Sequence, residues 1–127
     1  MRLLLAGLLT TGFFFSCGKD DDKEDPSKAI QCDTTGFTLA NSRYGTEIKN
    51  ILDSNACLSC HSASIADGGI ILEGYDNLKK YVDDDRLLGT IAHLNGYEPM
   101  PRGGGPKMAQ TDICRIKFWV DNGAPNN

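Results

Sequence analysis

Apolar residues recur at helical spacing in four segments of the chain, and this pattern predicts an all-α fold. The segments run from about residue 42 to 55, from about 75 to 82, from about 84 to 93 and from about 111 to 122. Their apolar positions are Tyr44, Ile48, Ile51 and Leu52; Tyr75, Leu78, Tyr81 and Val82; Leu87, Leu88 and Ile91, with Leu94 as a further candidate; and Ile113, Ile116 and Val120. Between the first two segments, Gly68 and Gly69 predict a loop, and a short extended piece follows at 70–72. We expect almost no strand.

The last predicted helix has the clearest end signals. Thr111 is the expected N-cap, Asp112 lies in the first turn, and Gly123 is the expected C-terminal stop. Cys114 and Trp119 lie on this helix, and Trp119 is most simply explained as a core residue between helices.

Residues 1–16 have the pattern of a secretion signal of the lipoprotein type. Arg2 gives the positive start, the stretch from Leu3 to Phe15 is apolar, and Ser16 precedes Cys17. The apolar stretch is too short for an ordinary transmembrane helix. Residues 14–18 resemble a bacterial lipobox, with Phe14 where leucine is usual, so we expect cleavage before Cys17 and lipidation of its thiol. A plain signal peptide with a spare thiol at Cys17 is the alternative.

Residues 17–31 are predicted to form the lipidated N-terminus and a flexible acidic tether, because residues 19–26 contain no apolar side chain. Residues 32–127 then form one small domain without internal repeats. This arrangement predicts a cell-envelope location, periplasmic or on the cell surface, with a membrane anchor through the N-terminal lipid. The acidic run is similar to the export tags of some surface lipoproteins, although a solvated spacer explains it equally well.

Residues 57–61 have the pattern C-x-x-C-H, which is the attachment signature of a c-type haem. On a tight helical turn the thiols of Cys57 and Cys60 can add to the two vinyl groups of one porphyrin, and His61 can offer an imidazole to the iron. We therefore expect one covalent haem c as the cofactor.

Three other kinds of site contain a C-x-x-C element. A thioredoxin-like dithiol requires a preceding strand and a βαβ context, which the pattern does not provide. A structural zinc site requires four ligands, and the nearest further donors, His93 and Cys114, do not form a second pair. A disulfide between Cys57 and Cys60 would leave His61 without a role.

The five cysteines divide into three groups. Cys17 is assigned to the lipid and Cys57 with Cys60 to haem, which leaves Cys32 and Cys114 as one pair. We predict a disulfide between these two residues, which would stabilise the domain by roughly 4 kcal/mol in the chain-entropy model. Two buried free thiols are the alternative.

The second axial ligand of the iron has three candidates: Met100, Met108 and His93. We predict Met100, because Pro99 and Pro101 stiffen the backbone on both sides of it. Met108 precedes the last helix and is expected to pack against it. His93 would give bis-histidine ligation, but a hydrogen bond near a propionate or at the end of its helix is the more ordinary role.

The formal net charge is −4, and the lysines and arginines after the tether are scattered, which argues against a nucleic-acid partner. Five of them could surround an exposed haem edge and steer an acidic redox protein, although each is also an ordinary solubilising charge: Lys79, Lys80, Arg86, Arg102 and Lys107.

The chain resembles small monohaem c-type cytochromes of the bacterial class I type over about residues 32–127. The resemblance lies in the order of five motifs: residues 57–62, residues 69–72 followed by Tyr75, residues 91–93, residues 99–104, and residues 116–127. It implies a small helical domain wrapped around one haem, with the proline-flanked Met100 as the distal ligand. It also implies that the Trp119 helix packs on the helix leading to the haem motif.

The expected function is outer-sphere transfer of one electron to and from redox protein partners. No bond in a substrate changes, so we expect an electron carrier and not an enzyme, with no small-molecule substrate. Two alternatives stay open: a haem enzyme or gas sensor with a labile distal position, and an auxiliary haem domain of a surface lipoprotein assembly.

Overall fold

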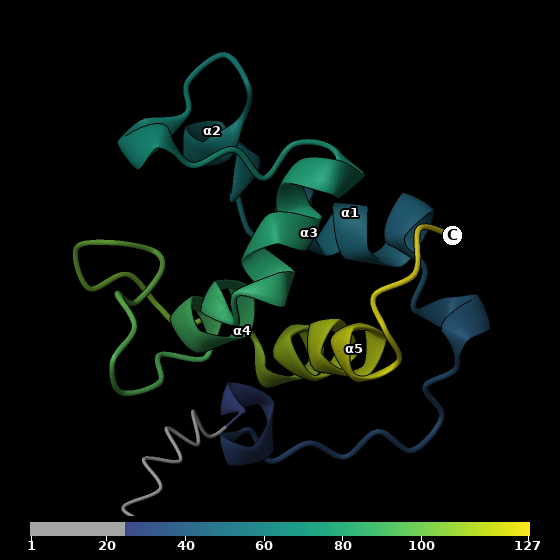
Figure 1. Ribbon diagram of the computed structural model, residues 1–127. Coiled ribbons are helices and arrows are strands. Elements are labelled where there is room, and N and C mark those ends of the chain that lie inside the picture. The colour runs from purple at the N-terminus through teal and green to yellow at the C-terminus, as the bar shows by residue number, and fades with distance from the viewer. Residues whose placement is uncertain (1–24) are drawn as a thin grey trace, which may run out of the picture.

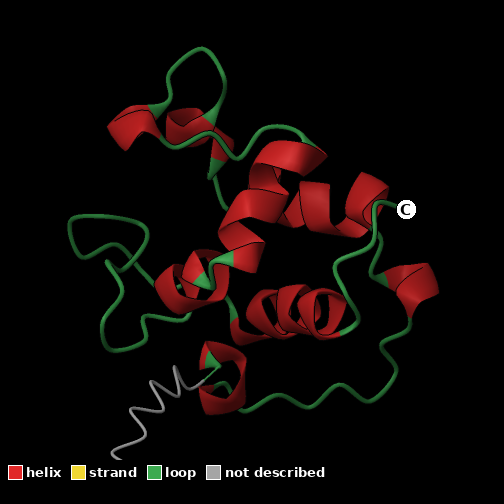
Figure 2. Ribbon diagram, viewed as in Figure 1, coloured by secondary structure: helices red, strands yellow, loops and turns green. Residues whose placement is uncertain are grey.

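The computed structural model describes residues 25–127, and every regular element within them is helical (Figure 2). The all-α expectation is confirmed for this part of the chain. The predicted signal peptide (residues 1–16), the proposed lipid-bearing Cys17 and the tether as far as residue 24 lie outside the described residues. Within the described range, no helix combines the length and apolar character needed to cross a membrane.

The elements follow one another with short connections, except for the long segment between the last two helices. In chain order they are η1 (Pro26–Ala29), η2 (Leu39–Asn41), η3 (Tyr44–Ile48), α1 (Lys49–Ser54), α2 (Leu58–His61), η4 (Asp67–Gly69), α3 (Tyr75–Asp83), α4 (Arg86–Ile91) and α5 (Gln110–Asp121). Figure 1 shows α1, α3, α4 and α5 gathered together, while α2 and the loop after it lie at the edge of this group. Each of the four predicted helical segments is present.

The first predicted helix begins with a π-helical turn. In η3 the N–H of Ile48 bonds the carbonyl of Arg43, five residues back, before α1 continues with ordinary geometry. The helix start is capped from the far end of the described chain. Asn127 accepts the N–H of Tyr44 at its side-chain oxygen (3.0 Å) and the N–H of Gly45 at its backbone oxygen (2.8 Å). Two donors that a helix start leaves unpaired are thereby satisfied.

The core is centred on Trp119, which is fully buried together with Ile48, Leu78, Ile113 and Ile116. The Trp119 ring stacks on Tyr44 with ring centroids 6.2 Å apart, and its indole N–H donates to the carbonyl of Pro125 at 2.9 Å. The expectation that Trp119 is an interhelix core residue is confirmed. Its contact with Tyr44 joins α5 to the helical segment that leads to residues 57–61.

The N-cap of α5 lies two residues earlier than predicted. The helix begins at Gln110 with Ala109 as its N-cap, so Thr111 lies inside the first turn and caps nothing. The Gln110 side chain donates to the carbonyl of Gln31 at 3.0 Å. This tertiary contact involves the first helical residue and cannot be seen in the local pattern.

The C-terminal stop of α5 is confirmed at Gly123. Gly123 has a positive φ of 87°, its N–H bonds the carbonyl of Val120, and the N–H of Ala124 bonds the carbonyl of Trp119. This is the Schellman arrangement that glycine favours at a helix end. It turns the chain so that the Ala124 carbonyl accepts a hydrogen bond from the Tyr75 hydroxyl at 2.8 Å.

Residues 25–31 correct the predicted boundary between tether and domain. The carboxylate of Asp25 accepts the N–H of Ser27 and caps η1, which contacts α4, and Ile30 is buried in the core. The packed domain therefore begins at about residue 26 and not at residue 32. The burial of Ile30 helps to anchor the segment, and the local charge pattern does not reveal this contribution.

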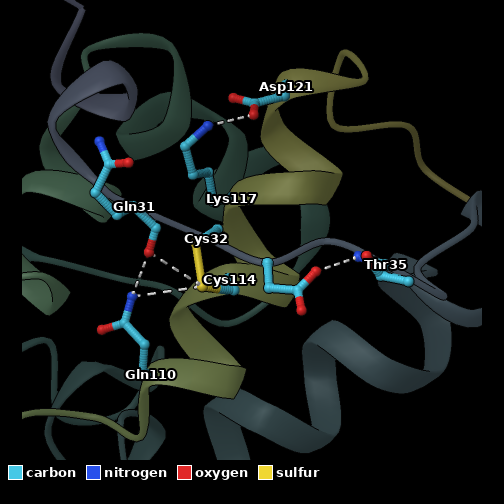
Figure 3. The surroundings of a disulfide bond; sticks show 8 residues. Gln31, Cys32, Thr35, Gln110, Cys114, Lys117 and Asp121 are labelled. Carbon is cyan, nitrogen blue, oxygen red and sulfur yellow. Dashed lines mark hydrogen bonds and ion pairs between the residues drawn. A yellow bond between two sulfur atoms is a disulfide. The ribbon is translucent and has the colours of Figure 1, made fainter.

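The predicted disulfide between Cys32 and Cys114 is present, with an S–S distance of 2.11 Å and a sequence separation of 82 (Figure 3). It ties the segment that follows η1 to the middle of α5. The hydrogen bond from Gln110 to Gln31 lies beside it, as Figure 3 shows, so the N-terminal part of the domain is fastened to α5 at two neighbouring points.

Candidate functional site

The C-x-x-C-H motif forms a single helical turn, α2, with Cys57 as its N-cap. Ala56 has a left-handed conformation with φ 55°, which turns the chain from α1 into α2. The N–H of Cys57 bonds the carbonyl of Leu52, and the N–H of His61 bonds the carbonyl of Cys57 at 3.0 Å. This turn brings the side chains of Cys57, Cys60 and His61 to one cavity.

The cavity has a volume of about 270 Å³ and is bounded by α2, α3, α4 and the segment between α4 and α5. Most of its lining side chains are apolar, and a few polar groups lie among them. The lining residues are Asn55, Ala56, Cys57, Cys60, His61, Asp67, Ile70, Leu72, Tyr81, Arg86, Leu87, Thr90, Ile91, Met100, Pro101, Arg102, Pro106 and Met108. An apolar cavity with a few polar groups is typical of a cofactor site.

His61 is not a core histidine held by its protein neighbours. Its Nδ1 atom is buried and has no hydrogen-bond partner among residues 25–127. An unpaired buried nitrogen costs about 1–3 kcal/mol. The backbone of His61 is well anchored, because its carbonyl accepts the N–H of Leu72 at 2.8 Å. That bond holds the extended piece 70–72 beside α2, where Ile70 and Leu72 face the cavity.

The two thiols of the motif differ in environment. Cys57 is half-buried and Cys60 is exposed, and no disulfide joins them. Burial raises the pKa of the Cys57 thiol, and the nearby carboxylate of Asp53 raises this pKa further. A raised pKa keeps the group as a thiol, whereas a thioredoxin-like nucleophile needs a lowered pKa. The Cys57 environment therefore does not favour the dithiol interpretation.

One of the two further donors that a zinc site would need is already engaged. Cys114 is bonded to Cys32 and is not available as a ligand. Among residues 25–127, no group of three or more His, Cys, Asp and Glu side chains is arranged to hold a metal ion. Cys57, Cys60 and His61 face the same cavity without converging on one ion position.

The three candidates for the second axial ligand are placed differently. Met100 is half-buried and lines the cavity from the segment between α4 and α5. Met108 also lines the cavity, but it is buried and belongs to the hydrophobic core, as packing requires. His93 is not among the lining residues, and its Nε2 lies 2.8 Å from the backbone oxygen of Met100. Since a carbonyl only accepts, Nε2 carries the proton and donates.

Two of the five basic residues expected near an exposed haem edge line the cavity, and these are Arg86 and Arg102. Arg86 is held in place, because its Nε donates to Asp84 at 2.6 Å and its guanidinium lies 4.7 Å from the centroid of the Tyr81 ring. Lys79, Lys80 and Lys107 are not lining residues. Lys79 pairs with Asp83, and Lys80 donates to the side chain of Asn77.

Comparison with protein-family models, with curated proteins and with solved structures gives no match.

The contact between His93 and Met100 was not foreseen from the sequence. The available signal was the position of His93 directly after α4, where a helix end usually has glycine. The pattern does not say which group, if any, the histidine side chain contacts.

Proposed function

We propose that this chain is a c-type cytochrome that transfers one electron and carries a single covalently attached haem. The observation that carries the proposal is that Cys57, Cys60, His61 and Met100 line one mostly apolar cavity. Two thiols, one imidazole and one thioether are the groups that a c-type haem with histidine and methionine ligation uses.

The residues present fit this cofactor. Cys57 and Cys60 would form the two thioether bonds, and His61 and Met100 would supply the two axial ligands. Nδ1 of His61 has no hydrogen-bond partner within residues 25–127, so no contact at this atom commits the imidazole to a purely structural role. When bound, the haem supplies an iron centre that gains and loses one electron.

The other cavity residues define the surroundings of that centre. Ile70, Leu72 and Leu87 give the cavity apolar walls, and an apolar environment favours the less charged reduced state of a bound iron. Arg86 and Arg102 place positive charge at the cavity, where they suit carboxylates of the cofactor or of an acidic protein partner. The function proposed is that of an electron carrier, in which no bond of a substrate changes.

The location proposed for this carrier is the cell envelope, where a lipid on Cys17 would anchor the protein to a membrane. The disulfide between Cys32 and Cys114 supports this, because such bonds persist in oxidising compartments. Labelling of the expressed protein with a radioactive fatty acid tests the anchor, and a Cys17→Ser variant should carry no label.

The test of the cofactor is expression together with haem-maturation machinery, followed by intact mass and a reduced-minus-oxidised spectrum. We expect a mass gain of one haem that survives denaturation, and the sharp reduced bands of a low-spin haem. Cys57→Ala and Cys60→Ala should each lose one thioether bond, while Ser59→Ala, within the same turn, should mature normally. A colourless wild-type protein of unchanged mass would overturn the proposal.

A carrier is distinguished from a haem enzyme or gas sensor by the ferric spectrum. A weak far-red band from a bond between methionine sulfur and iron is expected in a carrier with a retained distal ligand. Its absence, together with rapid binding of cyanide or carbon monoxide, would favour a protein with an open coordination position.

A further inference from the structure

We propose that His93 is a positioning residue for Met100: its ring fixes the backbone of Met100 so that the thioether stays in the cavity and remains on the iron. This inference rests on the proposed function. It goes further by assigning a role to a residue that does not line the cavity.

Both backbone polar groups of Met100 are held by the end of α4. Its N–H donates to the carbonyl of Thr90 at 3.2 Å, and its carbonyl accepts from Nε2 of His93 at 2.8 Å. With both groups fixed, the backbone at Met100 has little freedom to rotate. The Cα atom of Met100, from which the thioether side chain extends, is thereby held relative to α4, which itself lines the cavity through Leu87, Thr90 and Ile91.

Along the segment between α4 and α5, the hydrogen bond between His93 and Met100 is the last one, in chain order, that ties the segment to the end of α4. Within the described chain, residues 101–108 form no hydrogen bond with α4. The segment continues through Gly103 and Gly104, both with left-handed φ angles of 85° and 81°. Without the bond from His93, the backbone of Met100 would keep only the hydrogen bond from its N–H to Thr90. The glycines that follow give the neighbouring backbone wide conformational freedom.

The backbone of His93 has a conformation that glycine adopts most readily. His93 has a left-handed conformation with φ 55° at the residue that follows the C-cap of α4. Its N–H bonds the carbonyl of Thr90, and the N–H of Leu94 bonds the carbonyl of Gly89, which completes a Schellman arrangement. Glycine suits this position best, and any residue with a Cβ is strained there. The histidine at this position makes a bond to Met100 that glycine could not make.

Two variants give opposite outcomes for a positioning role and for a purely structural one. His93→Gly removes the donor and relieves the backbone strain, so it is expected to fold. His93→Gln keeps a donor at about the reach of Nε2 but keeps the strain as well. If His93 only shapes the turn, the glycine variant should equal or exceed wild type and the glutamine variant should be the poorer one. If His93 positions Met100, the order is reversed.

The readouts are taken on the haem-loaded full chain and report on the iron and its ligand. They are the far-red methionine–iron band of the ferric protein, the reduction potential, and the affinity for added imidazole, which competes with the thioether. For His93→Gly we expect a weakened far-red band, a lower potential and about fivefold tighter imidazole binding, as the loss of one hydrogen bond implies. His93→Gln should stay within about twofold of wild type.

The measurements distinguish failure of the proposed function from failure of the positioning role of His93. A wild-type protein without covalent haem or without the far-red band would overturn the proposed function itself. A wild-type protein with the band, combined with a His93→Gly variant whose band, potential and imidazole affinity are unchanged, would overturn the positioning role alone. Equal losses in both variants would also overturn it, because a retained donor would then have no effect.

Discussion

Gly89 lies directly under the ring of Tyr97. A Cβ atom at Gly89 would be 2.3 Å from both Cγ and Cδ1 of that ring, so α4 and the segment carrying Met100 touch where only glycine fits. Tyr97 cannot clear the space by rotating its ring about the Cβ–Cγ bond, because Cγ lies on that rotation axis. This contact fixes the segment independently of the bond between His93 and Met100.

Gly89→Ala is therefore expected to destabilise the protein, although alanine is the better helix former by about 1 kcal/mol. Displacing Tyr97 should cost about 1–3 kcal/mol and weaken the far-red methionine–iron band of the loaded protein. Thermal unfolding and the ferric spectrum measure the two effects. Adding Tyr97→Ala should make the Gly89→Ala change much less costly, and strictly additive effects would show that the two residues do not interact.

Met100 and Met108 should respond to replacement in opposite ways. Met100→Ala should abolish the far-red band with a small effect on unfolding, because its side chain is half-buried in a surface segment. Met108→Ala should keep the band and lower the free energy of unfolding by about 2–5 kcal/mol, because it empties space in the core. The converse pair of results would assign the ligand to Met108.

Replacing both Cys32 and Cys114 by serine should lower the free energy of unfolding by roughly 4 kcal/mol. The closed loop is long, with a sequence separation of 82, so the unfolded chain gains much freedom when the bond is removed. Chemical denaturation of the double variant measures the loss. The reduced-minus-oxidised spectrum should be unchanged, because neither cysteine lines the cavity, and an altered spectrum would count against this separation of roles.

Tyr75→Phe should cost about 0.5–1.5 kcal/mol, since it removes the hydrogen bond from the hydroxyl to the Ala124 carbonyl and keeps the ring. That bond holds the turn after α5, which in turn lets Asn127 cap the helix start at Tyr44. Tyr81→Phe is the matched control, because Tyr81 lies on the same helix and its hydroxyl makes no hydrogen bond within residues 25–127. Equal losses in the two variants would contradict the proposed anchor.

Several features followed from the sequence because they depend on neighbouring residues. The four helical segments follow from apolar spacing, and Gly123 marks the end of α5 because a left-handed helix end needs glycine. The C-x-x-C-H motif is likewise local, since Cys57, Cys60 and His61 lie on one turn. The pairing of Cys32 with Cys114 followed from counting the cysteines, with no geometry required.

Other features depend on residues that only the fold brings together. The π-helical start at Tyr44 is capped by Asn127, α5 begins at Gln110 whose side chain reaches Gln31, and Ile30 draws the predicted tether into the core. His93 and Met100 are seven residues apart with no shared pattern, and their hydrogen bond exists because the chain turns back onto α4. The sequence by itself determined the local helices and the chemical groups of the site. The tertiary structure decided how those groups are held, because partners distant along the chain satisfy their backbone donors and acceptors.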